Sequence, residues 1–527
     1  MRVDAETTGD EHEFLRIVAR PCPYRNMRTL DIAVLLVYAV AVTAFGAYFY
    51  RRSGSATQFM VAGRRLPAVV VGLSIFATYL SSISFLALPG KAYGADWSPF
   101  AFSLSLPIAA FVAARWFVPL YRATDDVSAY AYLERRFGVW ARLYAASFYL
   151  LTQIARVATI LFLVALALKS FTDWDIVWVI IATGVLVTLY TTVGGIEAVI
   201  WTDVIQAIVL TVGVLVCATM LLVGLPEGLA QFFDVAAEHG KFSLGSFVPD
   251  PTVAGFWVVL IYGLFINLQN FGIDQSYIQR YQTARTLEAA RRSLWLGALL
   301  YIPVSLLFLF LCSALFVYYT AHPELLPEAL RSVDAADRIF PHFIANELPA
   351  GLTGLLIAAL FSAAMSSIDT SLNSSATVLA TDFYRRFVRP DADEHRQLRF
   401  LRVTSIALGA IGTAVALLMI SIKSTLDAWW NLAGIFSGGM LGLFLLGALS
   451  RRAGSFAAGI GMVLGLLLLA WAALSPRIEV AWANPLHAFM TTVIGTLTIF
   501  LVGVVLSRRH VRQTTPAGKP ARTVHDI

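Results

Sequence analysis

The sequence predicts an all-α protein that crosses a membrane about thirteen times. Of its 527 residues, 58% are hydrophobic and only 14% are charged, whereas a soluble globular protein has about 25% charged residues. Many apolar runs approach the roughly 20 residues that a helix needs to span a bilayer. The expected spans are 30–50, 70–92, 98–121, 141–169, 175–192, 199–224, 254–275, 292–319, 350–380, 401–422, 427–448, 454–475 and 486–507.

One of these spans is unusually polar. The segment Gly354–Tyr384 begins as an apolar helix and then presents a run of hydroxyl and carboxyl groups. Hydrocarbon offers such groups no hydrogen-bond partner, so they must face protein, water or an ion. Ser366, Asp369 and Thr370 lie at positions i, i+3 and i+4, which places their oxygens on one helical face. Hard oxygens, one of them anionic, favour a small hard cation over a soft metal.

The distribution of positive charge predicts the orientation. With the N-terminus outside, the inner segments, among them 51–65, 115–142, 280–292 and 385–402, hold about twice as many Lys and Arg as the outer ones. The net charge of +6 therefore reflects topology, and we expect no nucleic-acid partner. The sequence predicts a multi-pass protein of the cytoplasmic (inner) membrane, with its C-terminus in the cytoplasm.

We interpret residues 29–508 as a single membrane domain. Residues 1–28 form a polar N-terminal extension, and a start at Met27 would remove its first 26 residues. Residues 509–527 form a basic tail that we expect to be disordered. The three cysteines indicate neither a disulfide framework nor a metal site. No soluble domain of useful size remains for a kinase, hydrolase or nucleotide-binding module, and we do not expect an enzyme.

Two spans are interrupted by polar residues. The interruptions lie about five spans apart, which is typical of two inverted repeats whose broken helices meet near the midplane and expose backbone carbonyls. The repeats would cover 70–224 and 254–448. The alternative is a pair of kinked helices that pack through Ser and Asn. The interrupting residues are Thr78, Tyr79, Ser81, Ser82 and Ser84 in the first span and Asn267, Gln269, Asn270 and Gly272 in the second.

Four segments resemble the sodium:solute symporter family. They are FATYLSSISF (Phe76–Phe85), YTTVGGIEAVIWTDVIQ (Tyr190–Gln206), IQRY (Ile278–Tyr281) and SSIDTSLNS (Ser366–Ser374). Within the family, ARVATILFLVALAL (Ala155–Leu168) and KAYGADW (Lys91–Trp97) resemble the bacterial sodium/sialic-acid symporters. The resemblance implies a LeuT-type 5+5 inverted repeat with an extra N-terminal helix and two or more C-terminal helices.

Oxygen geometry and the resemblance together predict a first sodium site. An unwound stretch over 77–80 would free the carbonyls of Ala77 and Leu80, and neutral oxygens of this kind can replace a hydration shell without binding the ion too tightly to release it. The polar helix would add the Ala363 carbonyl and the hydroxyls of Ser366 and Ser367. The alternative is that the two serines only bond back to their own helix.

The resemblance also implies a second sodium site, formed by Asp203, Ser366, Asp369 and Thr370. On the residues alone, Asp203 is equally well interpreted as an interfacial carboxylate. Asp369 stands where those relatives have a hydroxyl, so two carboxylates would share the site. They would either attract the ion more strongly or retain a proton, because like charges raise a pKa. We therefore expect one or two coupled sodium ions.

Arg156 is the candidate substrate anchor. It lies near the middle of the apolar span 141–169, where a guanidinium needs a bidentate anion or several carbonyls. The resemblance implies that it binds a substrate carboxylate together with Ser81 and Ser84; the alternative is a structural ion pair. Tyr79 replaces a Thr of the sialic-acid relatives and Ser103 replaces a Gln, so we expect a reshaped pocket.

The sequence therefore predicts a sodium-coupled symporter that imports a small organic anion, such as sialic acid or a related acidic sugar, by alternating access. Its partners would be the substrate, sodium and the lipid bilayer, and we expect the monomer to be the functional unit. The alternative is a sodium symporter for a monocarboxylate, amino acid or neutral sugar. A cation channel is disfavoured because the oxygens come from unlike helices, and a sodium-responsive sensor is disfavoured because no output domain is attached.

Overall fold

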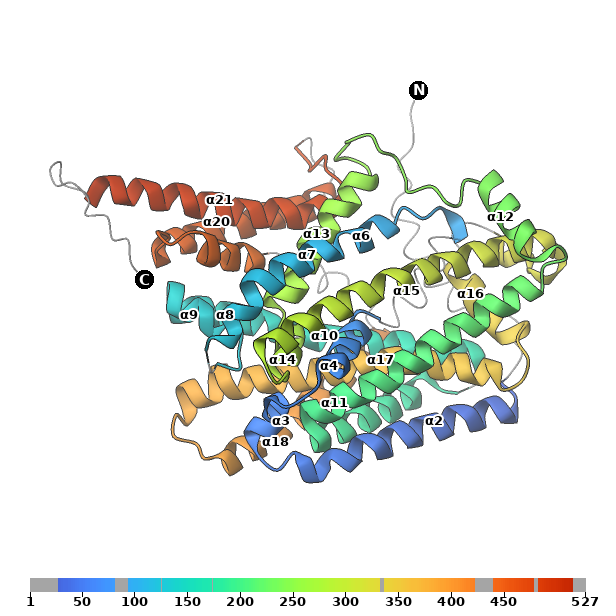
Figure 1. The fold of residues 1–527 in the computed structure, drawn as a ribbon, viewed down its shortest axis with the longest axis horizontal. Helices are drawn as coiled ribbons and strands as arrows, with labels where there is room; N and C mark the ends of the chain where they lie inside the picture. The colour runs from blue at the N-terminus through green and yellow to red at the C-terminus, as the bar shows by residue number, and fades with distance from the viewer. Residues whose placement is uncertain are drawn as a thin grey trace.

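The computed structural model describes residues 27–80, 93–124, 126–172, 174–331, 336–421, 439–477 and 482–514. Within these residues the protein is helical, as predicted, with one isolated bridge between Leu66 and Ala284. The long helices run roughly along the horizontal direction of Figure 1 and form a single bundle, with α20 and α21 side by side at one flank.

The helices of the first half are α2 (Thr29–Tyr48), α3 (Ala56–Val61), α4 (Ala68–Tyr79), α6 (Phe100–Leu104), α7 (Leu106–Val112), α8 (Val118–Arg122), α9 (Ala131–Phe137), α10 (Val139–Phe171) and α11 (Ile176–Val223). Those of the second half are α12 (Gly228–Glu238), α13 (Phe256–Ile273), α14 (Gln275–Gln282), α15 (Leu287–Ala321), α16 (Ala336–Asn346), α17 (Leu352–Val378), α18 (Glu394–Ser421), α20 (Ser455–Leu474) and α21 (Ala488–Thr514). A π-helical turn, Leu379–Val388, continues α17.

In the described part of the chain, 10 helices are long and apolar enough to cross a membrane. The 48 residues of α11 cover two of the expected spans, because Gly195 interrupts the helix. Two further expected spans fall on the shorter helices Ala68–Tyr79 and Gly439–Leu449, whose expected remainders, 81–92 and 427–438, lie outside the described residues. The count of about thirteen spans stays a prediction.

Gly195 is required by the geometry of this break. Its backbone has φ 62° and ψ −163°, a left-handed region that residues with a Cβ rarely adopt. A Cβ at this position would also lie 3.0 Å from the Cα of Phe59. The Gly194–Gly195 pair therefore sets where α11 breaks and lets α3 approach the break.

A non-helical residue lies within the first predicted interruption, and another lies two residues after the second. The helix α4 continues through Tyr79, and Leu80, the last described residue before the gap at 81–92, is extended (φ −83°, ψ 105°). The second break is at Asp274, after Gly272, where the backbone is extended between α13 and α14. Asn267 does not break α13 because its amide bonds to Tyr79, Ser105 and the Phe102 carbonyl and not to the backbone of its own helix. Asp274 does, because its carboxylate caps the N-terminus of α14.

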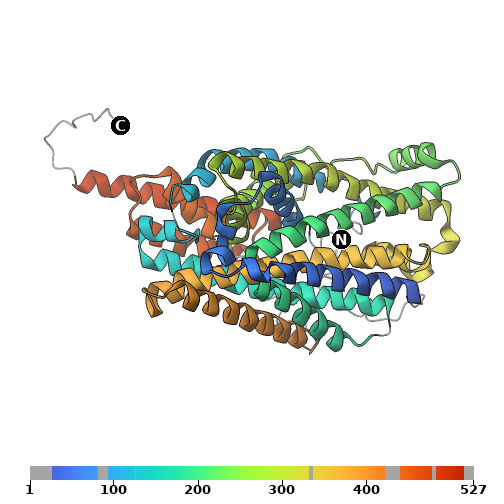
Figure 2. The same cartoon turned by 60° about the horizontal axis from the view of Figure 1, so that its bottom comes forward.

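The polar helix α17 lies at the centre of the bundle. It packs against α11, α10, α18 and α2, and Figure 2 shows it enclosed by these neighbours. In its apolar window 83% of the residues are buried, against 22% for the peripheral helix α2. Protein therefore surrounds the hydroxyl groups that hydrocarbon would not accept.

The leading helix α2 is joined to α17 by one side chain. Oδ1 of Asp31 accepts the backbone N–H groups of Gly351, at 2.6 Å, and of Gly354, at 3.0 Å. A Cβ on Gly354 would lie 2.6 Å from the Cα of Asp31, so only glycine permits this approach. Asp31 is 2% exposed, and it satisfies two of the backbone N–H groups that a helix N-terminus leaves unpaired.

Replacing Gly195 by Val should destabilise the protein by about 2–4 kcal/mol, because a branched side chain would occupy a left-handed position and press on the backbone of Phe59. The melting temperature of the detergent-solubilised protein measures the effect. Gly454→Ala is the matched control, since no atom lies within 4 Å of the added Cβ. An unchanged melting temperature for Gly195→Val would show that the break does not need this glycine.

Candidate functional site

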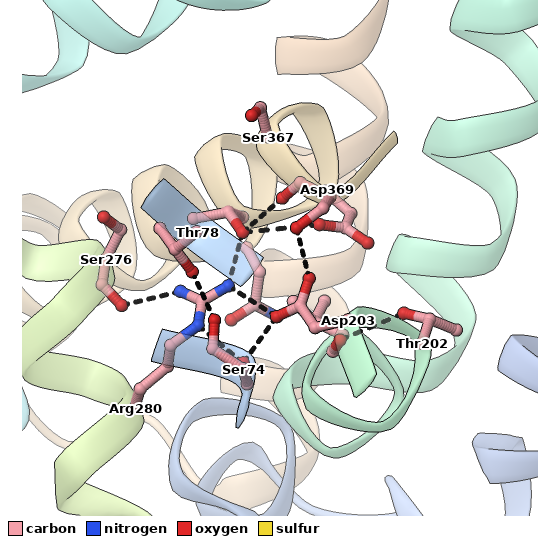
Figure 3. A network of polar contacts seen from close by, with 12 residues as sticks. Ser74, Thr78, Thr202, Asp203, Ser276, Arg280, Ser367 and Asp369 are labelled. Carbon is pink, nitrogen blue, oxygen red and sulfur yellow. Dashed lines mark hydrogen bonds and ion pairs between the residues drawn. The ribbon is translucent and has the colours of Figure 1, made fainter. Parts of the chain in front are cut away.

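A network of polar side chains connects four helices at the centre of the bundle (Figure 3). Asp203, from the second half of α11, is fully buried. One of its carboxylate oxygens accepts hydrogen bonds from Ser74 of α4, at 2.5 Å, and from Arg280 of α14, at 2.9 Å. The other accepts a hydrogen bond from Ser366 of α17, at 2.5 Å. One carboxylate thus holds α4, α14 and α17 against α11.

Arg280 is the cation of this network and is 1% exposed. Besides the ion pair with Asp203, its guanidinium donates to the hydroxyl of Ser74, at 2.8 Å, to the carbonyl of Ser276, at 2.7 Å, and to the hydroxyl of Thr370. Sequence analysis assigned Arg280 to an inner loop, which is wrong. After the extended residue Asp274 the chain continues as the short helix α14, which is buried along its length.

A buried ion pair of this kind constrains the fold more than it stabilises it. Taking both charges out of water costs several kcal/mol per ion, and their attraction offsets this cost only when hydrogen bonds satisfy the remaining polar atoms. Here Ser74, Ser366 and the Ser276 carbonyl supply those bonds. Removing one partner alone would leave an uncompensated charge in the centre of the bundle.

Asp369 is the second buried carboxylate, on the same helical face of α17. It accepts a hydrogen bond from the hydroxyl of Tyr190, at 2.6 Å, and a longer one from Thr370, at 3.4 Å. The predicted second-site residues Asp203, Ser366, Asp369 and Thr370 therefore lie in one connected network. The network also contains Arg280, Ser74 and Tyr190, which were not predicted as site residues. Two carboxylates and one guanidinium leave it with one negative charge if all three are ionised.

The predicted first-site residues lie where the end of α4 packs against α17. The Oγ of Ser367 is buried and has no hydrogen-bond partner among the described residues, and Figure 3 shows it apart from the Asp203 network. A buried hydroxyl that bonds to nothing requires an explanation, and an unrecorded ion or water is a common one. The alternative that both serines merely bond back to their own helix is wrong for Ser367, and Ser366 donates to Asp203.

One detail of the predicted first site differs. The carbonyl of Ala77 is not freed by unwinding, because it accepts the N–H of Leu80 at 3.0 Å. The helix tightens in its last turn and ends only at Tyr79. A carbonyl oxygen has two lone pairs, so this bond leaves Ala77 one acceptor position. Ala363 is buried on the facing side of the site, in α17.

Tyr79 lies in an aromatic cluster between the two broken helices. Its ring centroid is 5.1 Å from those of Tyr277 and Tyr301 and 5.4 Å from that of Phe271. Its hydroxyl donates to Asn267 at 3.2 Å. The side chain is therefore fixed by its neighbours on α13, α14 and α15, and it forms part of the wall at the end of α4.

Arg156 is half-buried near the middle of α10. The described residues offer it neither an ion pair nor a hydrogen bond, although it lies near enough to Tyr149 and Tyr277 for an electrostatic interaction. Tyr277 therefore connects the surroundings of Arg156 with those of Tyr79. The predicted partners Ser81 and Ser84 lie outside the described residues.

Ser103 lies apart from the end of α4, in the wall of a separate cavity. Its hydroxyl pairs with that of Ser305 at 2.7 Å, and both line a cavity of about 410 Å³ with Tyr262, Tyr301 and Phe489. The rings of Tyr262 and Phe489 are stacked, with centroids 4.4 Å apart. Because Tyr301 touches both this cavity and Tyr79, the cavity lies next to the aromatic cluster.

The sequence contained signals for the residues that were missed. Arg280 and Tyr190 belong to the segments that resemble the family, IQRY and YTTVGG. Their burial depends on the breaks at Asp274 and Gly195, which bring distant segments together. Ser74 is one turn before Thr78 on α4, whose own hydroxyl bonds back to the Ser74 carbonyl. No cluster of three His, Cys, Asp or Glu side chains suited to a soft metal occurs in the part of the chain described.

Comparison with known proteins assigns this arrangement to a family. The model of the "Sodium:solute symporter family" matches residues 59–465, which include every residue of the network. The chain belongs to the sodium:solute symporter family. As a member of it, the protein is a multi-pass membrane transporter that couples solute movement to sodium, and it is not an enzyme.

Two curated symporters of this family cover almost the whole chain. The sodium/sialic acid symporter NanT of Aliivibrio fischeri is 36% identical over 91% of this chain and 93% of its own length. The sodium/sialic acid symporter SiaT of Proteus mirabilis is 34% identical over 94% of this chain and 96% of its own length. A solved structure of a Na⁺-coupled sialic acid symporter, in a substrate-bound outward-open state, is 33% identical and has a TM-score of 0.84 over 92% of this chain and 98% of its own.

Replacing Arg280 by Met should destabilise this symporter by about 3–5 kcal/mol, because it leaves the carboxylate of Asp203 buried and unpaired. The double variant Arg280→Met/Asp203→Asn should recover much of the lost melting temperature, since both charges are then absent. Arg292→Met is the control: its pair with Glu288 is exposed and should matter by less than about 1 kcal/mol. Equal melting temperatures for Arg280→Met and Arg292→Met would contradict this account.

Proposed function

We propose that this chain imports sialic acid or a closely related acidic sugar, together with sodium, by alternating access. The main support for an anionic substrate is Arg156. Its guanidinium lies near the middle of α10 and lacks an anionic partner among the described residues. The similarity to NanT and SiaT over most of both chains supports the same class. The oxygen-rich face of α17 supports the coupling to sodium.

Arg156 would bind the substrate carboxylate. A planar guanidinium matches a carboxylate through two parallel hydrogen bonds, which supply both energy and orientation. In the bundle interior, a guanidinium without such a partner is costly, so the anion completes the site. Ser81 and Ser84 would share the carboxylate, and Tyr79 and Ser103 would contact the rest of the substrate. The cavity beside Ser103 is mostly apolar, and the hydroxyls of Ser98, Ser103 and Ser305 are among the polar groups that could contact the hydroxyls of a ligand.

Sodium would bind at two places on α17. At the first, the carbonyls of Ala77, Leu80 and Ala363 and the hydroxyls of Ser366 and Ser367 would surround the ion. Five neutral oxygens can replace water around a monovalent cation and still release it. The partnerless Oγ of Ser367 supports this placement. The ion would fix the extended end of α4 against α17 and so complete the substrate pocket.

The second ion would bind at Asp203, Ser366, Asp369 and Thr370. One guanidinium neutralises one of the two carboxylates, so a monovalent cation would balance the other. Asp369 already has the Tyr190 hydroxyl as a donor and retains acceptor positions for an ion. This placement requires the ion to share Asp203 and Thr370 with Arg280.

The transport cycle follows from this coupling. Sodium and substrate would enter from outside, the loaded protein would close and open inward, and both would leave into the cytoplasm. The membrane potential contributes about 2.3 kcal/mol per charge for each 100 mV. Two sodium ions with one anion would carry one net positive charge. From the distribution of Lys and Arg we expect the N-terminus outside and the C-terminus in the cytoplasm, and we expect a functional monomer in the inner membrane.

A smaller organic acid is the second candidate substrate. Tyr79 is fixed by Tyr277, Tyr301, Phe271 and Asn267, so its ring cannot easily turn aside for a larger ligand. The carboxylate anchor would be the same for both candidates. The two differ in the space that the ligand needs beyond its carboxylate, which the uptake of labelled sialic acid and of small carboxylates distinguishes.

Sodium replacement tests the coupling. Accumulation in proteoliposomes should cease when choline replaces external sodium. Ser367→Ala should raise the sodium concentration for half-maximal uptake by roughly 5- to 30-fold, because one ligand of the first ion is lost. Ser405→Ala is the matched control, since that buried hydroxyl bonds back to its own helix. Concentrative uptake that persists in choline would overturn the coupling.

Replacing Arg156 by Ala tests the anchor. Acidic sugars should raise the melting temperature of the wild-type protein in sodium and should not raise that of the variant, because a bidentate carboxylate contact is lost. Affinity should fall by roughly 100-fold. Stabilisation by sodium alone should persist in the variant, which distinguishes a lost anchor from a misfolded protein. Normal substrate stabilisation of Arg156→Ala would contradict the assignment.

A further inference from the structure

A basic cavity lies outside the sites described above, at the end of the bundle where α3 meets α11. Its volume is about 810 Å³. In Figure 1 this region is at the lower left, where α3 lies beside α11. By the positive-inside rule this end faces the cytoplasm. The cavity is lined by Arg52, Gly54, Ser55, Gln58, Arg65, Leu66, Pro67, Glu197, Trp201 and Arg285.

The lining carries more positive than negative charge. Glu197 is the one carboxylate among the described lining residues. It pairs with Arg65 at 2.8 Å and with Arg52 at 3.3 Å. Arg285 donates to the Arg65 carbonyl at 2.6 Å and has no carboxylate within ion-pair distance in the described chain. Three guanidinium groups against one carboxylate leave two positive charges at the cavity.

These guanidinium groups are positioned and accessible. The side chain of Glu197 is only 4% exposed, so its carboxylate pairs with the two arginines from the buried side of the cavity. The side chains of Arg52 and Arg65 are 50% and 49% exposed. A guanidinium held at a rim, with free donors toward the opening, recognises phosphate through paired hydrogen bonds. The chemistry of the cavity therefore fits a phosphate-bearing anion.

The apolar surface next to the cavity indicates which anion. Trp201 in the lining shares one face of α11 with three exposed apolar residues, Ile208, Val212 and Leu215, which are 54%, 43% and 49% exposed. On α4, Val69 follows the lining residue Pro67 and is 60% exposed. In a membrane protein these exposed apolar faces contact lipid chains. A phosphate bound in the cavity would thus lie at the cytoplasmic end of the exposed apolar face of α11.

We propose that this cavity binds the phosphate of an anionic phospholipid such as phosphatidylglycerol, whose acyl chains lie along the exposed face of α11. Basic pockets at the cytoplasmic ends of membrane helices recognise anionic headgroups through this combination of charge and apolar surface. The lipid would join α3, the start of α4 and the segment before α15 at one point. This site does not depend on which solute the symporter carries.

The experiment uses the full-length protein, purified in detergent and stripped of lipid, with phosphatidylglycerol, phosphatidylcholine and inorganic phosphate as probes. Phosphatidylglycerol should raise the melting temperature and remain bound in native mass spectrometry, and phosphatidylcholine should do neither. The variant Arg52→Gln/Arg285→Gln keeps the Arg65–Glu197 pair and should need roughly 10-fold more phosphatidylglycerol.

The matched control is Arg451→Gln/Arg452→Gln, which removes the same charge from exposed positions outside the cavity and should behave as wild type. If Arg52→Gln/Arg285→Gln does not fold, Arg285→Gln alone serves, because it breaks no ion pair in the described chain, and it should weaken binding roughly 3-fold. Equal lipid binding by the cavity variant and the control would overturn the proposal. Inorganic phosphate that stabilises the protein as well as the lipid does, and displaces it, would assign the cavity to a soluble anion instead.

Discussion

The structure depends on a carboxylate and a guanidinium that meet in the centre of the bundle, away from bulk water. Asp203 and Arg280 are held by serine hydroxyls and one carbonyl, so that each charge has its hydrogen bonds as well as its counter-ion. The pair sets the relative positions of α4, α11, α14 and α17. Because neither charge can remain buried alone, the broken helices are held at the point where ion and solute sites would be built.

At the second proposed site an ion would have to share its ligands with Arg280. Thr370 already accepts from Arg280, and Asp203 already accepts from three donors. An added cation would therefore compete with existing hydrogen bonds and would not enter a preformed site. Such competition weakens its binding, which suits an ion that has to be released in each cycle. The first proposed site differs, because the hydroxyl of Ser367 has no other described bond to exchange.

Hydropathy and one polar helix were enough to predict the fold class. Apolar runs of membrane-spanning length are specified locally, and a face as polar as Ser366–Thr370 has to be enclosed by other helices. Hydropathy did not predict the burial of residues whose position depends on a backbone break. Asn267 was expected at a break but forms hydrogen bonds to neighbouring helices, whereas Asp274, which was expected inside the span 254–275, caps a new helix. Arg280 was consequently assigned to an inner loop. Arg156 was found because a charge in the middle of an apolar run is conspicuous without any tertiary information.

The contact between Asp31 and the start of α17 has a consequence for how the molecule moves. No side chain of α17 caps its own first turn, and the carboxylate from α2 satisfies two of its backbone N–H groups instead. The leading helix α2 thus supplies the N-terminal cap of α17. If α17 tilts during the proposed cycle, these two bonds would draw α2 along with it, and the extra helix would then take part in the movement.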